Sequence, residues 1–451
     1  MAGRRLDRLT RLGGLTGKVT RSYLQERLKG VLADEEERAR LKRRFQLEAA
    51  EQIAEQLGQL RGAAMKVGQG LAAAAGAIDL PEEVVLTLSR LNREAPPVPY
   101  RWIAEDIESS LGRPITSLFA SINPRPIGTA SLGQAHAGVL HTGRPVVVKV
   151  LHRGTLPSLQ TDLTVLRALL RSGKLLRRSG EELDQAFEEI SARLHEETDY
   201  LQEAANIAQF QRLLRDREGV KVPALVPALC SDRVLTMDLL PGVPLQEFLC
   251  RAAPEAHARA GHTLGGLFFE MVFRHRTLHA DPHPGNFLFQ EDGTVGLVDF
   301  GCVKRFDEFW IAHYARAALA GVDGDSELAL AAARDLGAWR GNSPQAGRLL
   351  WSFIDTIAAP FRAEEYTIGA AEHSVMERLR PTLRRLPMHA EIAVPPDLIY
   401  LHRALAGLYA IARRLVVRAP WGALLRREAE YAVNFAEGRL PSTGSADEHP
   451  R

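Results

Sequence analysis

The chain has 451 residues, 45% of them hydrophobic and 25% charged, so it is long enough to bury a large core in more than one domain. Its net charge of +2 creates no strong field toward nucleic acid, and nucleic-acid binding is therefore not expected. The three cysteines lie far apart in the chain, which argues against a disulfide framework or a zinc site and indicates a reducing, cytoplasmic setting.

Residues 1–33 form a basic N-terminal segment in which leucines recur at near-helical spacing. This pattern is typical of an amphipathic helix that contacts an anionic membrane or a partner. The alternative is a solvated lead-in to the first domain, which Gly13, Gly14 and Gly17 favour because glycine interrupts helices. No apolar run is long enough for a transmembrane span, so we expect any membrane contact to be peripheral.

Residues 34–99 are predicted to form a helical N-terminal extension. The stretch 34–75 contains no proline and is rich in helix formers. A second helix opens at Pro81, because proline suits a first helical turn. The proline-rich stretch 96–99 ends that helix and forms a stiff connector.

Residues 100–240 and 241–440 are predicted to form two lobes, followed by a disordered polar tail at 441–451. Apolar runs bounded by turn residues predict a hairpin at 135–151, a strand at 233–240 and a second hairpin at 287–298. The predicted helices cover 101–120, 158–178, 181–214, 254–278 and the region 306–438. This order of elements favours an α+β fold with a helix-rich second lobe.

The strongest chemical signal lies in the segment 279–286, HADPHPGN, and in the segment 299–301, DFG, which follows the second hairpin. An aspartate five residues before an asparagine, with another aspartate beyond a hairpin, is the layout of a kinase catalytic loop and magnesium loop. We therefore expect a two-lobed protein kinase-like fold with a helical N-terminal extension, an N-lobe at 100–240 and a helix-rich C-lobe.

The residue types in this layout suit phosphoryl transfer from ATP, or binding of ADP. Carboxylate and amide oxygens are the ligands that Mg²⁺ prefers, so Asn286 and Asp299 are predicted to bind the metal. Asp281 is predicted to orient or deprotonate the attacking hydroxyl or water. His279 and His283 offer an alternative, a transition-metal site, but no third soft ligand lies nearby, and we expect His279 to brace the loop.

Lys149 follows three valines on a predicted strand, where a charge is costly unless it is paired. Its position matches the kinase lysine that holds the α- and β-phosphates and pairs with a helix glutamate. The candidates for that glutamate are Glu196, Glu197 and Glu203. The loop before the strand contains Ala130 and Ser131, whose backbone N–H groups are predicted to approach phosphate.

Met237 and Leu239 lie where the strand 233–240 leaves the predicted N-lobe. In a kinase this connection contacts the adenine ring through backbone groups, so both residues are predicted to bind the cofactor. An ordinary exit from strand to loop is the alternative.

Several motifs resemble those of the UbiB/AarF family of atypical kinases, which are linked to coenzyme Q. Lys66-Val67-Gly68-Gln69 resembles the family's Lys-x-Gly-Gln signature, and Ala130–His136 resembles its alanine-rich loop. Glu197-Thr198-Asp199-Tyr200, with Glu203 and Asn206 beyond it, resembles the family's Glu-x-Asp-Tyr segment. The resemblance runs from about residue 60 to residue 305, and more loosely to Arg403-Ala404-Leu405-Ala406-Gly407.

The resemblance implies that Lys66, Gly68 and Gln69 belong to a lid over the nucleotide cleft. Glu197 and Asp199 would supply a carboxylate for Lys66, and Glu203 would pair with Lys149. Such a lid would occlude protein substrates and favour ATP hydrolysis or a small, lipid-like substrate, in support of ubiquinone biosynthesis. Gly128-Thr129 departs from the family's usual alanine, which leaves the preference between ATP and ADP open.

Two other functions stay open at this point. One is a small-molecule phosphotransferase of the aminoglycoside or choline kinase type, and the other is a non-catalytic, nucleotide-sensing scaffold. The expected partners are a nucleotide and either a quinone precursor or an anionic membrane surface. The late aromatic residues around Trp310, Tyr314 and Phe353 would line a lipid groove or, more simply, form the C-lobe core.

Overall fold

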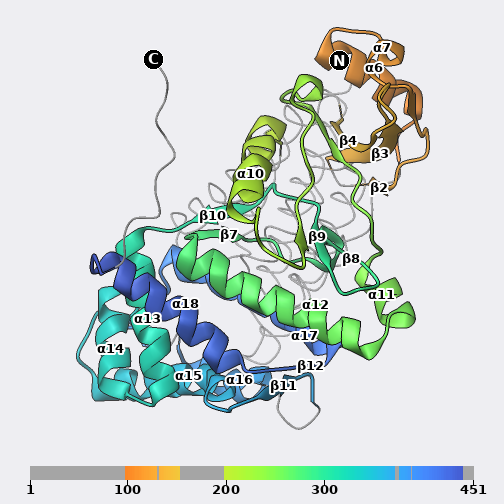
Figure 1. Cartoon of the computed structure of the whole chain (residues 1–451). Helices are drawn as coiled ribbons and strands as arrows, with labels where there is room; N and C mark the ends of the chain where they lie inside the picture. Colours follow the sequence, from red (N-terminus) through yellow and green to blue (C-terminus); the bar gives the residue numbers. More distant parts are fainter. Residues whose placement is uncertain (1–96, 130–131, 153–197, 371–374, 387–388, 440–451) are drawn as a thin grey trace, which may run out of the picture. The chain divides into compact units, whose positions relative to one another are not determined.

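A computed structural model describes residues 97–129, 132–152, 198–370, 375–386 and 389–439 (Figure 1). These residues form two compact units. One holds the described residues up to Ala204 together with Leu225–Leu239, and the other holds Ala205–Ala224 together with the described residues from Leu240 onward. The predicted N-terminal segment, helical extension and C-terminal tail lie outside the described residues, so their boundaries remain predictions.

The first unit is built on an antiparallel sheet with strand order β1-β3-β4-β6, in which β2 also pairs with β3. The strands are β1 (Ser121–Ile122), β2 (Gly128–Thr129), β3 (Gly133–Val139), β4 (Pro145–Leu151) and β6 (Val234–Asp238). In the register of β3 and β4, Ala135 lies opposite Lys149 and Val139 opposite Pro145. The hairpin predicted at 135–151 is therefore present.

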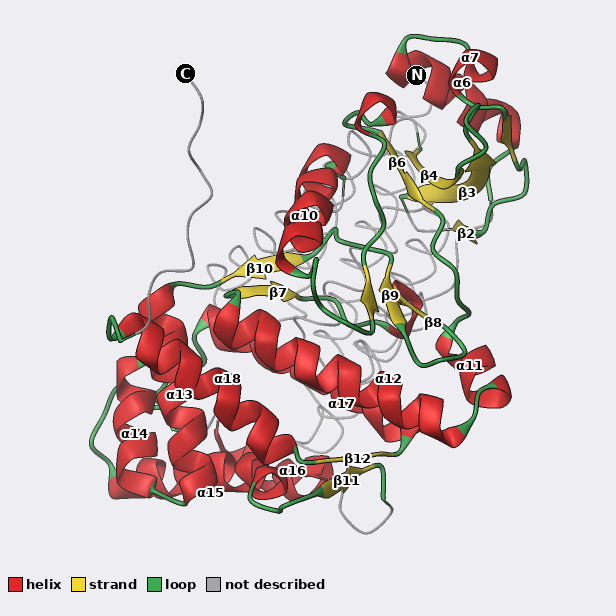
Figure 2. Ribbon diagram, in the orientation of Figure 1, coloured by secondary structure: helices red, strands yellow, loops and turns green. Residues whose placement is uncertain are grey.

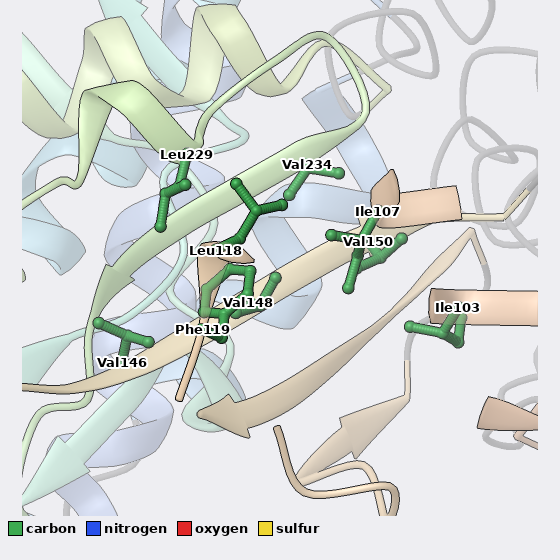
Figure 3. Close-up of a cluster of buried hydrophobic side chains, with 9 residues drawn as sticks. All are labelled: Ile103, Ile107, Leu118, Phe119, Val146, Val148, Val150, Leu229 and Val234. Atoms are coloured by element: carbon green, nitrogen blue, oxygen red, sulfur yellow. The ribbon is translucent and has the colours of Figure 1, made fainter. Parts of the chain in front are cut away.

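Helices α6 (Tyr100–Leu111) and α7 (Ile115–Leu118) flank this sheet. A single helix was expected at 101–120, but Gly112 ends α6 in a left-handed conformation with φ of 67°, which glycine adopts without steric cost. Val146, Val148 and Val150 alternate along β4 and pack with Ile103 and Ile107 of α6 (Figure 3). This apolar layer leaves Lys149 on the opposite face of the strand.

The second unit is mostly helical around three small sheets. Its helices are α11 (Leu245–Arg251), α12 (Pro254–Phe269), α13 (Glu308–Asp323), α14 (Ser326–Asp335), α15 (Pro344–Ala358), α16 (Val375–Arg385), α17 (Pro396–Leu415) and α18 (Trp421–Ala436). Its strands are β5 (Val220–Lys221), β7 (Thr277–His279), β8 (Phe287–Phe289), β9 (Val295–Leu297), β10 (Val303–Arg305), β11 (Tyr366–Ile368) and β12 (Val417–Ala419). Two short helical turns are η2 (Glu270–Arg274) and η3 (Pro284–Asn286). Helix α12 packs against α17 and α18.

Two predictions for the second unit were wrong in detail. The helix expected at 254–278 ends with the π-helical turn η2, and Thr277–His279 forms β7 instead, because these residues pair with β10. The region 306–438 was expected to be wholly helical, but β11 and β12 form an antiparallel pair within it (Figure 2). Strands of three residues are too short to show alternation in sequence, and partners distant in the chain decide them.

The late aromatic residues belong to the core. Trp310, Tyr314 and Ile354 pack against a buried cluster that includes Trp339 and Leu350. Burial raises the pKa of the Tyr314 hydroxyl. These contacts favour the core interpretation over the lipid groove. No helix within the described ranges is both long enough and apolar enough to cross a bilayer.

Candidate functional site

Lys149 is paired with a buried carboxylate in the first unit. Its Nζ lies 2.6 Å from Oε1 of Glu203, and the two side chains are 13% and 5% exposed. Glu203 belongs to the first turn of α10 (Tyr200–Leu213). Of the candidate glutamates, the described geometry therefore gives Lys149 the partner Glu203; Glu196 and Glu197 lie outside the described residues.

Asp199, predicted to belong to the lid, caps the start of α10. Its Oδ1 accepts hydrogen bonds from the backbone N–H groups of Leu201 and Gln202, at 3.1 and 3.0 Å. This contact fixes the helix that carries Glu203. The other lid residues, Lys66, Gly68, Gln69 and Glu197, lie outside the described residues, so the lid stays a prediction.

The alanine-rich loop is described from Leu132 onward, because Ala130 and Ser131 lie outside the described residues. Gly133 follows them at the start of β3. A Cβ at Gly133 would lie 2.5 Å from the carbonyl oxygen of Val150 and 3.1 Å from the hydroxyl of Tyr200. Glycine is therefore required here by close approach of the backbone.

Met237 and Leu239 end the sheet of the first unit. The Met237 side chain is buried, so only its backbone groups would be available to a ligand. The N–H of Leu239 donates to the carbonyl oxygen of Pro145 at 3.2 Å. Between them, Asp238 forms an ion pair with Arg144 at 2.5 Å. The adenine contact predicted for both residues remains a prediction.

In the second unit, two strand pairings bring the predicted catalytic and metal residues to the same region. The register of β7 and β10 pairs His279 with Val303, and Ala280 N–H donates to the carbonyl of Cys302 at 2.9 Å. The register of β8 and β9 continues with Val298 N–H donating to the carbonyl of Asn286 at 3.1 Å. Asp281, Asn286 and Asp299 lie at the adjoining ends of these pairings.

Asn286 is oriented by the catalytic loop itself. Its Nδ2 donates to the carbonyl oxygen of Asp281 at 2.8 Å and to Oδ2 of Asp281 at 2.9 Å. Both amide protons are therefore directed toward Asp281, and Oδ1 is the Asn286 atom that would be able to bind a metal ion. An amide oxygen and a carboxylate are donors that suit Mg²⁺, so the chemistry of Asn286 and Asp299 fits a nucleotide-bound magnesium ion.

His279, expected to brace its own loop, contacts the backbone of Asp299. Its Nε2 donates to the carbonyl oxygen of Asp299 at 2.6 Å, and the side chain is 3% exposed. The Nδ1 of His283 accepts from the N–H of Gly285. Among the described residues, no group of three or more His, Cys, Asp or Glu side chains is arranged to hold a metal ion. The transition-metal alternative gains no support from this geometry.

Asn206 has a role that sequence reasoning did not assign, although the residue was noted in a family motif. Its buried Nδ2 donates to the carbonyl of Phe300 at 2.9 Å, and its Oδ1 accepts from Arg305 at 2.9 Å. The Phe300 ring is fully buried against Phe210 and His279. The DFG segment is thus held by a helix more than 90 residues earlier in the chain.

Comparison with known proteins agrees with this geometry. The ABC1 atypical kinase-like domain matches residues 90–333, which is more than half of the chain. The solved complex of Rv3197 with erythromycin from Mycobacterium tuberculosis superposes with a TM-score of 0.59 at 26% identity, covering 84% of this chain and 94% of that one. The molecule therefore has the kinase-like α+β fold that its sequence predicts.

Two further relatives narrow the family. The mitochondrial atypical kinase COQ8B of Rattus norvegicus is 31% identical over 417 residues, which cover 91% of this chain and 78% of the relative. The mitochondrial atypical kinase COQ8 of Saccharomyces cerevisiae is 27% identical over 389 residues, covering 85% and 76%. The chain belongs to the UbiB/AarF family of ABC1 atypical kinases.

Proposed function

We propose that this chain is a magnesium-dependent ATPase or phosphotransferase of the UbiB/AarF type that supports ubiquinone biosynthesis. The observation that carries the proposal is the double hydrogen bond from Asn286 to Asp281, next to an Asp299 whose backbone is held by His279. These contacts link the residues that a kinase catalytic loop and magnesium loop would use, which supports the proposal.

Each residue would contribute one part of the chemistry. Asn286 and Asp299 would hold the Mg²⁺ ion, which neutralises charge on the phosphate oxygens. Lys149, kept in place by Glu203, would contact the α- and β-phosphates. Asp281 would orient the attacking hydroxyl or water and accept its proton.

Nucleotide binding and turnover can be separated by two substitutions. Asp299→Asn removes a metal-binding carboxylate and should abolish magnesium-dependent binding of a fluorescent ATP or ADP analogue. Asp281→Asn should keep binding but lower kcat by about 10²-fold or more, because the general base is lost. Asp216→Asn changes an exposed carboxylate elsewhere in the second unit, which also holds Asp281 and Asp299, and serves as the control. Unchanged binding in Asp299→Asn would contradict the proposed metal site.

The link to quinone lipids rests on the family resemblance and needs its own test. ATP hydrolysis should rise when anionic liposomes or phenols resembling quinone precursors are added to the full chain. The same additions to the Asp281→Asn variant should produce no increase. If neither addition changes the rate of ATP hydrolysis, the lipid part of the proposal is wrong and the ATPase part still stands.

A second candidate, phosphorylation of a small molecule, is favoured by one observation. The solved structural relative is a complex with erythromycin, a hydroxyl-rich small molecule. Transfer of phosphate from radiolabelled ATP to an aminoglycoside, choline or a macrolide would support this candidate. If phosphate is transferred to any of these molecules faster than ATP is hydrolysed by water, this candidate would replace the quinone-linked proposal.

A further inference from the structure

Helix α17 contacts the residues on both sides of Asp281. The Nη2 of Arg403 donates to the carbonyl oxygen of Ala280 at 2.9 Å, directly before the aspartate. Gly407 faces Pro282, directly after it, because a Cβ at Gly407 would lie 2.5 Å from Pro282 Cγ. Arg403 and Gly407 are four residues apart, so they share one face of the helix.

The peptide group before Asp281 is fixed at both polar atoms. Ala280 is fully buried; its N–H donates to the Cys302 carbonyl, and its own carbonyl accepts from Arg403. A hydrogen bond from a guanidinium is stronger than one between neutral groups, and a buried carbonyl that loses its donor is costly. Arg403 also lies 3.7 Å from the Sγ of Cys302, the residue after the DFG segment.

The peptide group after Asp281 needs a different kind of support. Pro282 is buried and has no N–H to donate, so packing must hold it. Gly407 supplies that packing, since any side chain there would meet both the ring and the carbonyl oxygen of Pro282. The two contacts together fix the backbone on either side of the catalytic carboxylate.

The same face of α17 also holds the strand beyond the magnesium loop. Lys304 of β10 forms an ion pair with Asp397 at 2.5 Å and lies over the ring of Tyr400. The guanidinium of Arg403 lies on the ring of Tyr400 as well, 5.9 Å from its centroid. One helix face therefore contacts the catalytic loop and the segment that follows Asp299.

The geometry points to Arg403 as a positioning residue for Asp281, with Gly407 as the spacer that lets α17 approach the loop. This inference rests on the proposed function, because it assigns a support to the proposed catalytic base. Arg403 acts on backbone atoms beside Asp281, so its loss should displace the carboxylate without removing any group that binds nucleotide. A displacement of about 1 Å at a reacting group costs roughly 10²-fold in rate.

The test compares Arg403→Met, Arg403→Lys and Gly407→Ala with Arg413→Met, which makes the same change at an exposed position of the same helix. Arg403→Met should lower kcat by about ten- to a hundredfold while KM for Mg-ATP changes by less than about threefold. Arg403→Lys retains a charged donor for the Ala280 carbonyl and should recover part of kcat. A kcat within about threefold of wild type in Arg403→Met, or no gain in Arg403→Lys, would overturn the inference.

A measurement that needs no turnover separates this inference from the proposed function. Hydrogen–deuterium exchange at the Ala280 and Asn286 amides should be faster in Arg403→Met than in wild type, and unchanged in Arg413→Met. If the wild-type protein shows no magnesium-dependent nucleotide binding or turnover, the proposed function is wrong. The exchange rates then test the positioning role of Arg403 by themselves. Exchange that is equal in Arg403→Met and wild type would refute the positioning role whatever the activity.

Discussion

At the scale of single residues, the buried ion pair of Lys149 and Glu203 predicts that replacing one partner lowers the free energy of unfolding more than replacing both. Lys149→Met leaves the Glu203 carboxylate buried without this cation. Such a loss costs about 3–5 kcal/mol of unfolding free energy. Adding Glu203→Gln removes the stranded charge and should restore most of that loss. Urea denaturation of the single and double variants measures the difference.

The matched control is the ion pair of Arg144 with Asp238 in the same unit. Its side chains are 39% and 32% exposed, so solvent screens the interaction. Arg144→Met should therefore cost less than about 1 kcal/mol. Equal losses in Lys149→Met and Arg144→Met would show that burial adds nothing to the Lys149 pair.

The residues proposed for catalysis and metal binding are the ones for which the sequence carries the strongest signals. Asp281, Asn286 and Asp299 have spacings that only a few chemistries require, and Lys149 is a charge on an apolar strand. The residues alone left the partner of Lys149 open among three glutamates, and the family resemblance implied Glu203. Arg403 could not be foreseen, because its contact with Ala280 joins residues 123 positions apart.

At the scale of elements, the glycines of α12 set how closely neighbouring elements pack. A Cβ at Gly265 would lie 2.1 Å from Cζ3 of Trp421 in α18. Gly265→Ala should therefore destabilise the protein by about 1–3 kcal/mol, because a buried indole has to shift. Thermal unfolding measures the loss, with His262→Ala, an exposed change on the same helix, as the control.

A second substitution tests whether the Trp421 ring is the cause. In a Trp421→Phe background the extra methyl of Gly265→Ala meets a smaller ring and should cost less than in wild type. Trp421 Nε1 donates to the carbonyl of Tyr366, so Trp421→Phe has a cost of its own that must be subtracted. An unchanged cost of Gly265→Ala in both backgrounds would point to another source of strain.

Long elements were predicted better than short ones. The β3–β4 hairpin has a turn with a glycine, seven-residue strands and a run of valines in β4, so its local signals agree. The three-residue strands β7, β11 and β12 carry no comparable signal, and their partners lie far along the chain. The expected helix at 254–278 was too long because its last residues gain more from pairing with β10 than from helical turns.

At the scale of the whole molecule, buried histidines make stability depend on pH. Burial between the rings of Tyr314 and Phe353 lowers the pKa of His402 to about 4, and burial also lowers the pKa values of His136 and His152. The unfolded chain binds protons near pH 6.5, so stability should fall as pH drops from about 6.5 toward 4.

Melting temperatures at pH 7 and pH 5 check this dependence. The decrease in Tm over that interval should be smaller in His402→Leu than in wild type, because a group that protonates only on unfolding is gone. His141→Leu replaces an exposed histidine and should leave the decrease unchanged. A decrease in His402→Leu as large as that of wild type would assign the pH dependence to other groups.

The short connection along the chain between β9 and β10 has a consequence for the design of compounds that bind this protein. Only residues 298–302 separate the two strands, and β10 is paired with β7. A compound that enters by displacing the Phe300 ring would have to expose an aromatic side chain that solvent does not reach. We expect compounds that leave the Phe300 ring buried to bind this protein more tightly than compounds that need the ring displaced.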